Sequence, residues 1–450
     1  MSTMLRDNNF LGRKSVHTLI LTLIFVFFTS CSNIGIFQNG GLVIAVPGSR
    51  SASESTIFTV TVADTAGNKQ SKNIVAGESA QFDDLVPGPY SISVEGKESD
   101  ISTMYGVAEV SVAAGKTATA SVSLSTVAHT FEALQLLIEK GGTVYIGSDI
   151  ELTAGLQVKG TNVKIVPLKN VVLKNNSTEP LFTVGTSTFS LGGSEYTLTL
   201  DGNNQAQHGV KVTEASFFLE KNTVITNCAN SGVYITSADF TMNGGTITKN
   251  TASSGGGVHV FQGTFIMNDG SITANELSGG DKNYGGGVYI ENCDFTMNGG
   301  IISNNTATLG GGMYVLHGTF FMNDGLITEN KLSGGDTSNG GGIYVENCDL
   351  NMNGGSITNH TEGIQQGGGI WVAETGDFKM INGTITGNSA EVGGGVYLFG
   401  IENGDKATCT LDGGTITGNS STNASGADIY AENTTFTNNG ATVEDVVIQE

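Results

Sequence analysis

Phe240-Thr241-Met242-Asn243-Gly244-Gly245-Thr246-Ile247-Thr248-Lys249-Asn250 is a phrase that the chain repeats with small changes as far as about Gly418. Each copy is followed by a second phrase, which is first Gly255-Gly256-Gly257-Val258-His259-Val260. Aligned on one apolar position, the copies fall 25 to 31 residues apart, at Met242, Met267, Met297, Met322, Met352, Met380 and Leu411. Tandem copies at such a period are typical of a solenoid, in which each repeat forms one coil.

The apolar residues inside each repeat alternate with polar ones. Phe240 and Met242 are flanked by polar residues, and Val258 and Val260 flank His259. This period of two predicts about three short strands per repeat, separated by Gly, Asn and Asp turns. Because strands this short cannot bury a face alone, consecutive coils must stack. We therefore predict an all-β protein built on a right-handed parallel β-helix.

Stacking would place equivalent residues of successive repeats in columns. One column would be an inward ladder of isoleucines, at Ile247, Ile272, Ile302, Ile327, Ile357, Ile385 and Ile416. Three residues later a polar column follows, at Asn250, Asn275, Asn305, Asn330, His360, Asn388 and Asn419. We expect these amides to hydrogen-bond from rung to rung, and the glycine triplets to form sharp corners with positive φ.

Two phrases of the repeat carry a resemblance to a known family. Phe240-Thr241-Met242-Asn243 and Gly255-Gly256-Gly257-Val258 resemble the paired F-x-x-N and G-G-A-[ILV] repeats of polymorphic outer-membrane proteins, which are bacterial surface adhesins. Here glycine stands where that family usually has alanine. The resemblance covers roughly the second half of the chain and implies a β-helix scaffold and a surface role.

Residues 1–30 are predicted to be a targeting segment. Arg13 and Lys14 precede an apolar run, and Phe28-Thr29-Ser30-Cys31 resembles a bacterial lipobox. The run is too short to span a bilayer. We expect cleavage before Cys31 and lipidation of its thiol, which would anchor the protein to the cell outer membrane, surface-exposed or facing the periplasm. The alternative is an ordinary cleaved signal in which Cys31 is incidental.

The remaining chain divides into a short tether and two units. Residues 31–41 form the tether, and residues 42–125 contain alternating strands and turns that resemble a carboxypeptidase regulatory-like β-sandwich, notably in Phe82-Asp83-Asp84-Leu85-Val86-Pro87-Gly88-Pro89-Tyr90. Residues 126–440 form the β-helix, with about twelve coils, and residues 441–450 an acidic tail. Thr130 is expected to cap a helix over residues 131–139 that covers the first coil. A helix followed by coils resembles the pectate-lyase-like superfamily.

Composition limits the partners. The formal charge is −22, and it becomes −24 without residues 1–30, which hold three cationic side chains and one anionic one. Such an acidic protein is not expected to bind nucleic acid. The histidines lack metal-ligand spacing, so we predict neither a metal nor a cofactor. Cys228, Cys293, Cys348 and Cys409 are interpreted as structural.

The superfamily implies an enzymatic alternative. Its lyases and methylesterases use an arginine, which this chain lacks after Arg50, and its polygalacturonases use three aspartates with Gly-His-Gly, which is missing too. Adjacent rungs could still bring carboxylates together, so an acidic patch that could act in catalysis or bind calcium is a candidate site. Its residues are Glu346, Asp349, Glu374 and Asp377.

Aromatic residues form a second candidate site beside the glycines. Tyr289, Tyr314, Tyr344, Trp371 and Tyr397 recur at one position of the repeat and are expected to face outward as a flat strip. Stacked rings stabilise a sheet by themselves, and they could also serve as a ligand platform. We predict a non-enzymatic, lipid-anchored protein used for adhesion to glycan or to host or matrix protein. A polysaccharide lyase or hydrolase and a purely structural or antigenic rod are the alternatives.

Overall fold

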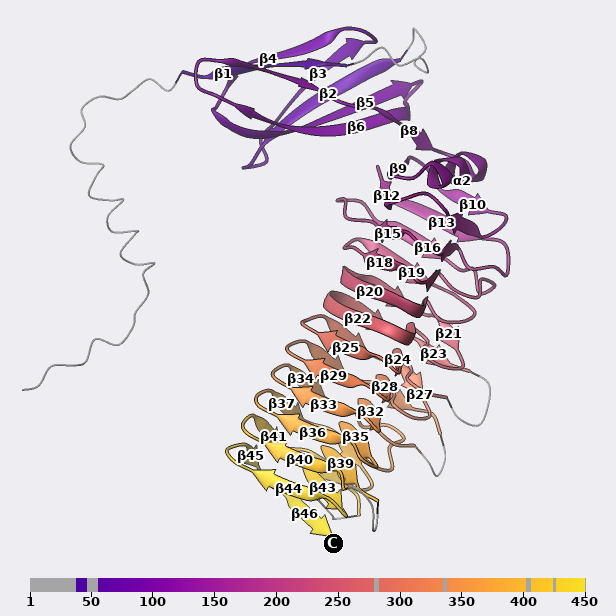
Figure 1. Ribbon diagram of the computed structural model, residues 1–450, viewed down its shortest axis with the longest axis vertical. Helices are drawn as coiled ribbons and strands as arrows, with labels where there is room; N and C mark the ends of the chain where they lie inside the picture. The colour runs from indigo at the N-terminus through magenta and orange to yellow at the C-terminus, as the bar shows by residue number, and fades with distance from the viewer. Residues whose placement is uncertain are drawn as a thin grey trace, which may run out of the picture.

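The computed structural model describes residues 38–46, 56–278, 283–334, 338–401, 406–423 and 426–449. Within these ranges a small unit of mostly antiparallel strands precedes a long coil of stacked parallel strands (Figure 1). The expected all-β class and right-handed parallel β-helix are confirmed.

Two sheets pack face to face in the N-terminal unit. One sheet has the order β4-β1-β7, formed by β1 (Gly40–Ala45), β4 (Ser79–Leu85) and β7 (Thr117–Ser121). The other pairs β2 (Ile57–Asp64) with β3 (Lys69–Val75) and β5 (Gly88–Glu98), and β5 with β6 (Ile101–Val112). Phe58, Val60 and Val62 point into the shared core and are at most 1% exposed.

Strands β3 and β4 lack the regular apolar alternation by which a strand is recognised in a sequence. β3 is polar and almost wholly exposed, so it has no apolar alternation. β4 has the buried residues Ala80, Phe82 and Leu85, but the last of these breaks the period of two. These two segments form strands because β3 pairs with β2 and β4 pairs with β1, which their local sequence pattern does not show.

The two units are joined by hydrogen-bonded strands. β8 (Ser125–Ala128) pairs antiparallel with β6 at Met104 and Tyr105, and its other end pairs parallel with β9 (Thr143–Ile146), the first strand of the coil. His129 lies across the same junction, with Nε2 2.6 Å from the Ser102 carbonyl oxygen and Nδ1 3.2 Å from the Ser148 hydroxyl. One ladder therefore runs from the N-terminal sheet into the solenoid.

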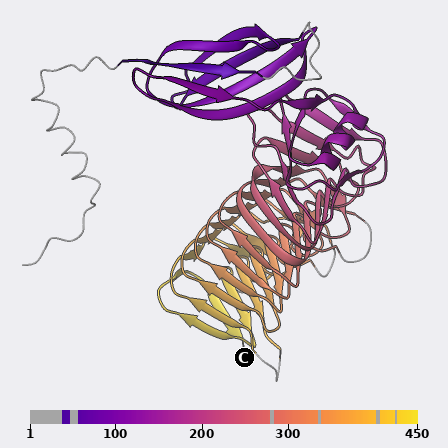
Figure 2. The same cartoon turned by 45° about the horizontal axis from the view of Figure 1, so that its top comes forward.

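The predicted capping helix is present. α2 (Phe131–Lys140) lies across the first coil, which Figure 2 shows with this end turned forward. The Thr130 hydroxyl accepts a hydrogen bond from the Ala133 amide at 3.3 Å, and Gly141 ends the helix with φ 84°. Leu134 and Ile138 are fully buried against the coil, so the helix covers an otherwise open end.

Three columns of parallel strands form the solenoid. Two long strands, β20 (Val233–Thr248) and β22 (Val258–Thr273), run through all three columns. The first column adds β9, β12 (Val163–Pro167), β15 (Thr188–Leu191), β18 (Ser216–Leu219), β25 (Asp294–Met297), β29 (Thr319–Met322), β33 (Asp349–Met352), β36 (Asp377–Met380), β40 (Thr408–Leu411) and β44 (Thr435–Asn438).

The second column adds β10 (Ile150–Leu152), β13 (Val171–Asn175), β16 (Leu198–Asp201), β19 (Thr223–Thr226), β26 (Ile301–Ser303), β30 (Leu326–Thr328), β34 (Ser356–Thr358), β37 (Thr384–Thr386), β41 (Thr415–Thr417) and β45 (Thr442–Val443). The third adds β11 (Leu156–Val158), β14 (Phe182–Val184), β17 (Val210–Thr213), β24 (Val288–Glu291), β28 (Met313–Leu316), β32 (Ile343–Glu346), β35 (Ile370–Ala373), β39 (Val396–Phe399), β43 (Ile429–Glu432) and β46 (Val446–Gln449).

The last rung differs from the prediction. Residues 441–450 were expected to be an acidic tail, but β45 pairs with β41 and β46 pairs with β43. Val446 and Val447 continue the pairing at Ile429 and Tyr430, and Val443 and Val446 pack against the core. Sequence reasoning missed this rung because the segment is acidic, but Glu444 and Asp445 lie in the turn between its two strands. The solenoid thus extends to Gln449, the last residue described.

Identical side chains fill the interior column by column. The predicted isoleucine ladder is confirmed, and all seven members are 0% exposed. A phenylalanine ladder runs beside it, with ring centroids 4.5–5.8 Å apart from Phe189 to Phe320. Cys409 occupies the phenylalanine position of its own rung. Repeating one residue in one column lets each rung pack on a copy of itself.

The glycine triplets form one corner of each coil. Their first members have positive φ, for example 58° at Gly255 and 63° at Gly310. A Cβ at Gly257 would come within 2.7 Å of the Gly287 carbonyl oxygen and 2.9 Å of the Asn275 amide nitrogen. The third glycine is therefore required because both the isoleucine column, with Ile272 only 2.5 Å from that Cβ, and the polar column lie against it.

Short strands form extra sheets beside this corner. They are β21 (Thr251–Ala252), β23 (Glu276–Leu277), β27 (Thr306–Ala307) and β31 (Lys331–Leu332), and separately β38 (Ser389–Ala390) and β42 (Ser420–Ser421). Two of the longer repeats carry extra residues at 276–284 and 331–339, and these segments begin as strands β23 and β31. Residues 279–282 and 335–337 within them lie outside the described ranges.

Candidate functional site

The aromatic residues form one continuous stack. Adjacent rings from Tyr289 to Tyr397 lie 4.3–6.3 Å apart and within 18° of parallel. The register explains the stack, since Tyr314 pairs with Tyr344 and Tyr344 with Trp371. The column extends through His259 at one end and Tyr430 at the other.

The stack is not the exposed strip that the sequence suggested. Its five candidate platform residues, Tyr289, Tyr314, Tyr344, Trp371 and Tyr397, are only 4–8% exposed. The residues that precede the glycine triplets form bridges from rung to rung, and Tyr284, Leu309 and Val392 among them pack against the rings. The rings do lie outside the interior core, in a cluster of their own, but the expectation that they are accessible is wrong because this neighbouring column covers them. The geometry is that of a stabilising ladder.

Carboxylates and amides satisfy the polar ends of these rings. The Tyr289 hydroxyl donates to Glu291 at 3.0 Å, and the Tyr314 hydroxyl donates to Glu346. Trp371 Nε1 donates to the Gln366 side chain at 3.2 Å. Burial, together with the bonded Glu346 carboxylate, raises the pKa of Tyr314 far above its usual value. These phenols therefore stay protonated and act as hydrogen-bond donors.

The four residues of the acidic patch are only partly brought together. Asp349 and Asp377 lie on adjacent rungs, because Leu350 pairs with Phe378. Burial is the main reason that the pKa of Asp349 is raised, and the neighbouring Asp377 charge raises it further. Among the residues described, no group of three or more His, Cys, Asp or Glu side chains could hold a metal ion.

Three of these carboxylates already have partners, since Asp349 accepts a hydrogen bond from the Asp377 backbone amide. Glu346 accepts a hydrogen bond from the Tyr314 hydroxyl, and Asp377 accepts hydrogen bonds from the Thr408 hydroxyl at 2.6 Å and the Thr408 amide at 3.2 Å. A similar bond joins Thr264 to Asp239 at 2.6 Å. Aspartates at the start of the first-column strands thus bond to threonines at the same position of the next rung. The sequence shows this alternation of Asp and Thr, but sequence reasoning did not use it.

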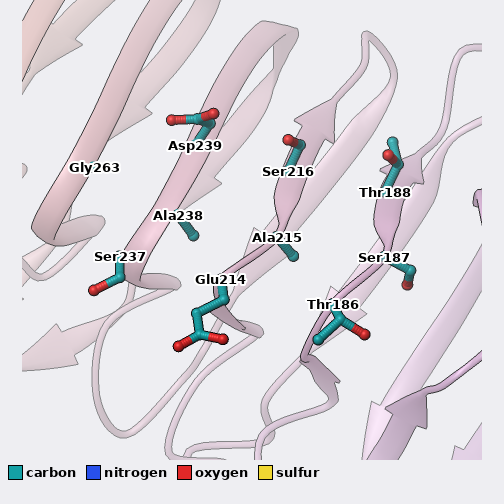
Figure 3. Close-up of a pocket in the computed structure, with 10 residues that line it drawn as sticks. All are labelled: Thr186, Ser187, Thr188, Glu214, Ala215, Ser216, Ser237, Ala238, Asp239 and Gly263. Carbon is teal, nitrogen blue, oxygen red and sulfur yellow. The ribbon is translucent and has the colours of Figure 1, made fainter.

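A polar cavity of about 460 Å³ lies on earlier rungs, on the side of the rod that carries Asp349 and Asp377. Figure 3 shows the residues that line it. It is lined from successive rungs by Thr186 to Thr188, Glu214 to Ser216, and Ser237 to Asp239, with Gly263. Its two carboxylates, Glu214 and Asp239, extend from different rungs (Figure 3). Asp239 is hydrogen-bonded to Thr264. Glu214 is therefore the one carboxylate of this cavity that has no side-chain hydrogen-bond partner in the described residues.

A buried polar ladder runs through the coil corner, as predicted. Asn305 Oδ1 accepts from the Asn275 backbone and side-chain amides, each at 3.0 Å. Asn305 Nδ2 donates to the Ile272 carbonyl and to Asn330 Oδ1, again each at 3.0 Å. Every hydrogen-bonding direction of the buried amide is thereby used.

His360 takes the place of one asparagine in this ladder. Its Nδ1 lies 2.8 Å from Asn388 Oδ1, so that nitrogen carries the proton, and Asn330 Nδ2 donates to its Nε2 at 3.2 Å. Both contacts require a neutral ring, because Nε2 must accept. Complete burial lowers the pKa of His360 to about 4.

We expect acid to destabilise the fold through His360. Between pH 6.5 and about 4 the unfolded chain binds a proton that the folded ring does not, so stability falls as pH falls through this window. Replacing His360 by Asn restores the repeat's amide and removes this titration. From pH 7 to pH 4, the wild type should lose about 3 kcal/mol more unfolding free energy than H360N.

Urea unfolding at a series of pH values measures this difference. His208, whose pKa burial also lowers to about 4, titrates in both proteins and cancels in the comparison. Parallel pH profiles for the wild type and H360N would refute the assignment.

A second cavity, of about 480 Å³, lies where the N-terminal unit meets the solenoid. Its walls come from both units and include Lys69, Tyr105, Tyr145, Lys164 and Tyr196. The Tyr105 and Tyr145 rings meet edge to face, with centroids 4.8 Å apart. Sequence reasoning missed this site because no repeated pattern connects its members.

The cysteines within the described residues are free and buried, as their structural interpretation requires. Cys228 stands in the polar column, where its amide donates to Asn250 Oδ1 at 3.0 Å. Burial raises the pKa of the Cys293 thiol to about 11, so the thiol stays protonated and unreactive. Cys31, the predicted lipidation site, lies outside the described residues.

No protein-family model matches the chain, and neither the curated proteins nor the solved structures include a significant relative. Among the described residues, no helix has the length and hydrophobicity needed to cross a membrane.

Proposed function

We propose that this protein is an exported, lipid-anchored protein of the cell envelope that uses its β-helix as a rod for adhesion to glycan or protein. Anchoring would occur through Cys31 in the outer membrane, and the N-terminal unit, with its likeness to carboxypeptidase regulatory-like domains, would act as a spacer. The likeness of the repeats to those of polymorphic outer-membrane proteins supports a surface role.

The observation that carries this proposal is an exposed ladder of asparagines on the rod. The side-chain Nδ2 of each member donates to the Oδ1 of the member before it at 2.8–2.9 Å, through Asn243, Asn268, Asn298, Asn323 and Asn353. Bonding to the next rung fixes each amide, yet leaves one N–H per residue free to bind a ligand. Such a rigid, repeated row of donors suits the hydroxyls of a glycan or the carbonyls of a polypeptide.

Adhesion of cells that display the full chain tests the proposal. Displaying cells should bind a panel of immobilised glycans and matrix proteins saturably. Cells carrying Cys31→Ser should release the protein and lose adhesion. Replacing Asn268, Asn298 and Asn323 together by Ser should reduce adhesion about tenfold while the protein stays at the surface. Equal adhesion by cells with and without the protein would refute the proposed function.

One observation favours a second candidate, a polysaccharide lyase or hydrolase. The close pair Asp349 and Asp377, in which the pKa of Asp349 is raised, could combine an acid with a carboxylate. Turnover of uronic-acid polymers that is abolished by Asp377→Asn would establish this alternative. A purely structural or antigenic rod would show neither turnover nor saturable adhesion.

A further inference from the structure

We propose that the cavity between the N-terminal unit and the first coils binds a short acidic sugar, with tyrosine rings contacting the sugar faces and two lysines binding its carboxylate. The inference deepens the proposed function, on which its biological meaning rests, by naming a ligand class and a site for it.

The cavity is formed by parts of the chain that the fold brings together. β6 supplies Tyr105 and Val107, β9 supplies Tyr145, and β12 supplies Lys164, Val166 and Pro167. In Figure 1, β9 and β12 lie at the top of the rod and β6 lies above them in the N-terminal unit, and β8 pairs with both β6 and β9. A volume of about 480 Å³ at a junction between two units is typical of a small-ligand site.

The aromatic walls are suited to a partly apolar, partly polar ligand. Tyr196 is 37% exposed, so its ring is accessible. Tyr145 is only 7% exposed, yet it lines the cavity, and its hydroxyl has no hydrogen-bond partner in the part of the chain described. A pyranose presents C–H groups to a ring and hydroxyls to a phenol, which matches both features.

Hydrogen bonds hold the loop that carries Tyr196. The Ser194 hydroxyl donates to the Pro167 carbonyl at 3.1 Å, and the Tyr196 amide donates to that hydroxyl at 3.2 Å. The Asn222 side chain donates to the Ser194 carbonyl at 2.8 Å. The ring is therefore positioned before a ligand arrives, which lowers the entropy cost of binding.

The charges select an acidic ligand. Lys69 and Lys164 both line the cavity, and within the described ranges neither forms an ion pair, whereas nearby Lys97 is paired with Glu95 at 3.1 Å. The Lys164 ammonium lies beside Gly193, 3.6 Å from the point where a Cβ would be. Two unpaired ammonium groups attract a carboxylate, while Glu195, which also lines the cavity, is hydrogen-bonded to the Tyr196 side chain and helps to position that ring.

Binding to the mature full-length protein tests the inference with two matched probes, trimannuronate and neutral mannotriose. Calorimetry should show trimannuronate binding roughly tenfold more tightly than mannotriose, with the difference shrinking as salt is added. Tyr196→Ala should weaken binding of both sugars roughly tenfold. The double variant Lys69→Gln and Lys164→Gln should weaken trimannuronate alone, while Lys174→Gln, on another face of the coil, should leave both affinities unchanged.

The outcomes separate this inference from the proposed function. No binding of either sugar to a folded wild type, or binding unaffected by the cavity variants, would overturn the inference even if displaying cells still adhere. Sugar binding in the cavity without adhesion would support the inference and refute the proposed function. Unchanged melting of each variant shows that a loss of affinity comes from the site.

Discussion

Replacing Asn305 by Leu should lower the free energy of unfolding by about 4–6 kcal/mol. Leucine has nearly the same size, so packing is kept while the amide is lost. The Asn275 backbone N–H and one of its side-chain N–H groups would lose their acceptor, and the Ile272 carbonyl would lose its donor. Each unsatisfied buried group costs about 1–3 kcal/mol, and these three lose their partner, whereas Asn330 Oδ1 keeps its hydrogen bond from the Asn305 backbone.

Asn298→Leu is the matched control in the same repeat. Asn298 also bonds to its neighbours above and below, at 2.9 and 2.8 Å, but these bonds lie at the surface. Water can replace them, so the control should lose less than about 1 kcal/mol. Urea unfolding and hydrogen exchange of the neighbouring amides measure both variants. Equal losses for the two would show that burial of the ladder does not determine its contribution.

The second large effect concerns two adjacent phenylalanines that face opposite ways. Phe320 is 0% exposed and stacks on Phe295 with centroids 4.9 Å apart, whereas Phe321 lies on the outer face of β29 and is partly exposed. Phe320→Ala would leave a cavity between Phe295 and Leu350, its neighbours in the column. We expect it to cost about 3–5 kcal/mol.

Phe321→Ala should cost about 1 kcal/mol or less, because it removes the same side chain from a surface where no cavity forms. Thermal and urea unfolding of the two variants give the comparison directly. A loss at Phe321 as large as that at Phe320 would contradict the inward and outward assignment of this strand.

The sequence alone predicted the features that repeat. A period of 25 to 31 residues with apolar alternation puts one residue type in each column, so the spacing is enough to assign Ile302 and Asn305 to their ladders. The capping helix was predictable for local reasons, an N-cap at Thr130 and an apolar face. The ladders depend on contacts between equivalent positions of successive repeats. In a solenoid these positions lie next to each other, so the repeat spacing is enough to predict the contacts.

The tertiary structure decided which groups are accessible and which unlike segments meet. Trp371 appeared exposed because its strand alternates, yet it is 8% exposed because dissimilar residues before the glycine triplets cover the ring column. The cavity joins Tyr105 to Tyr145 and Tyr196, which no shared spacing connects. Periodicity determines which face of its own sheet a side chain points to. Whether other residues cover that face, and which segments meet where the two units join, depend on contacts between non-equivalent residues, which a repeat does not show.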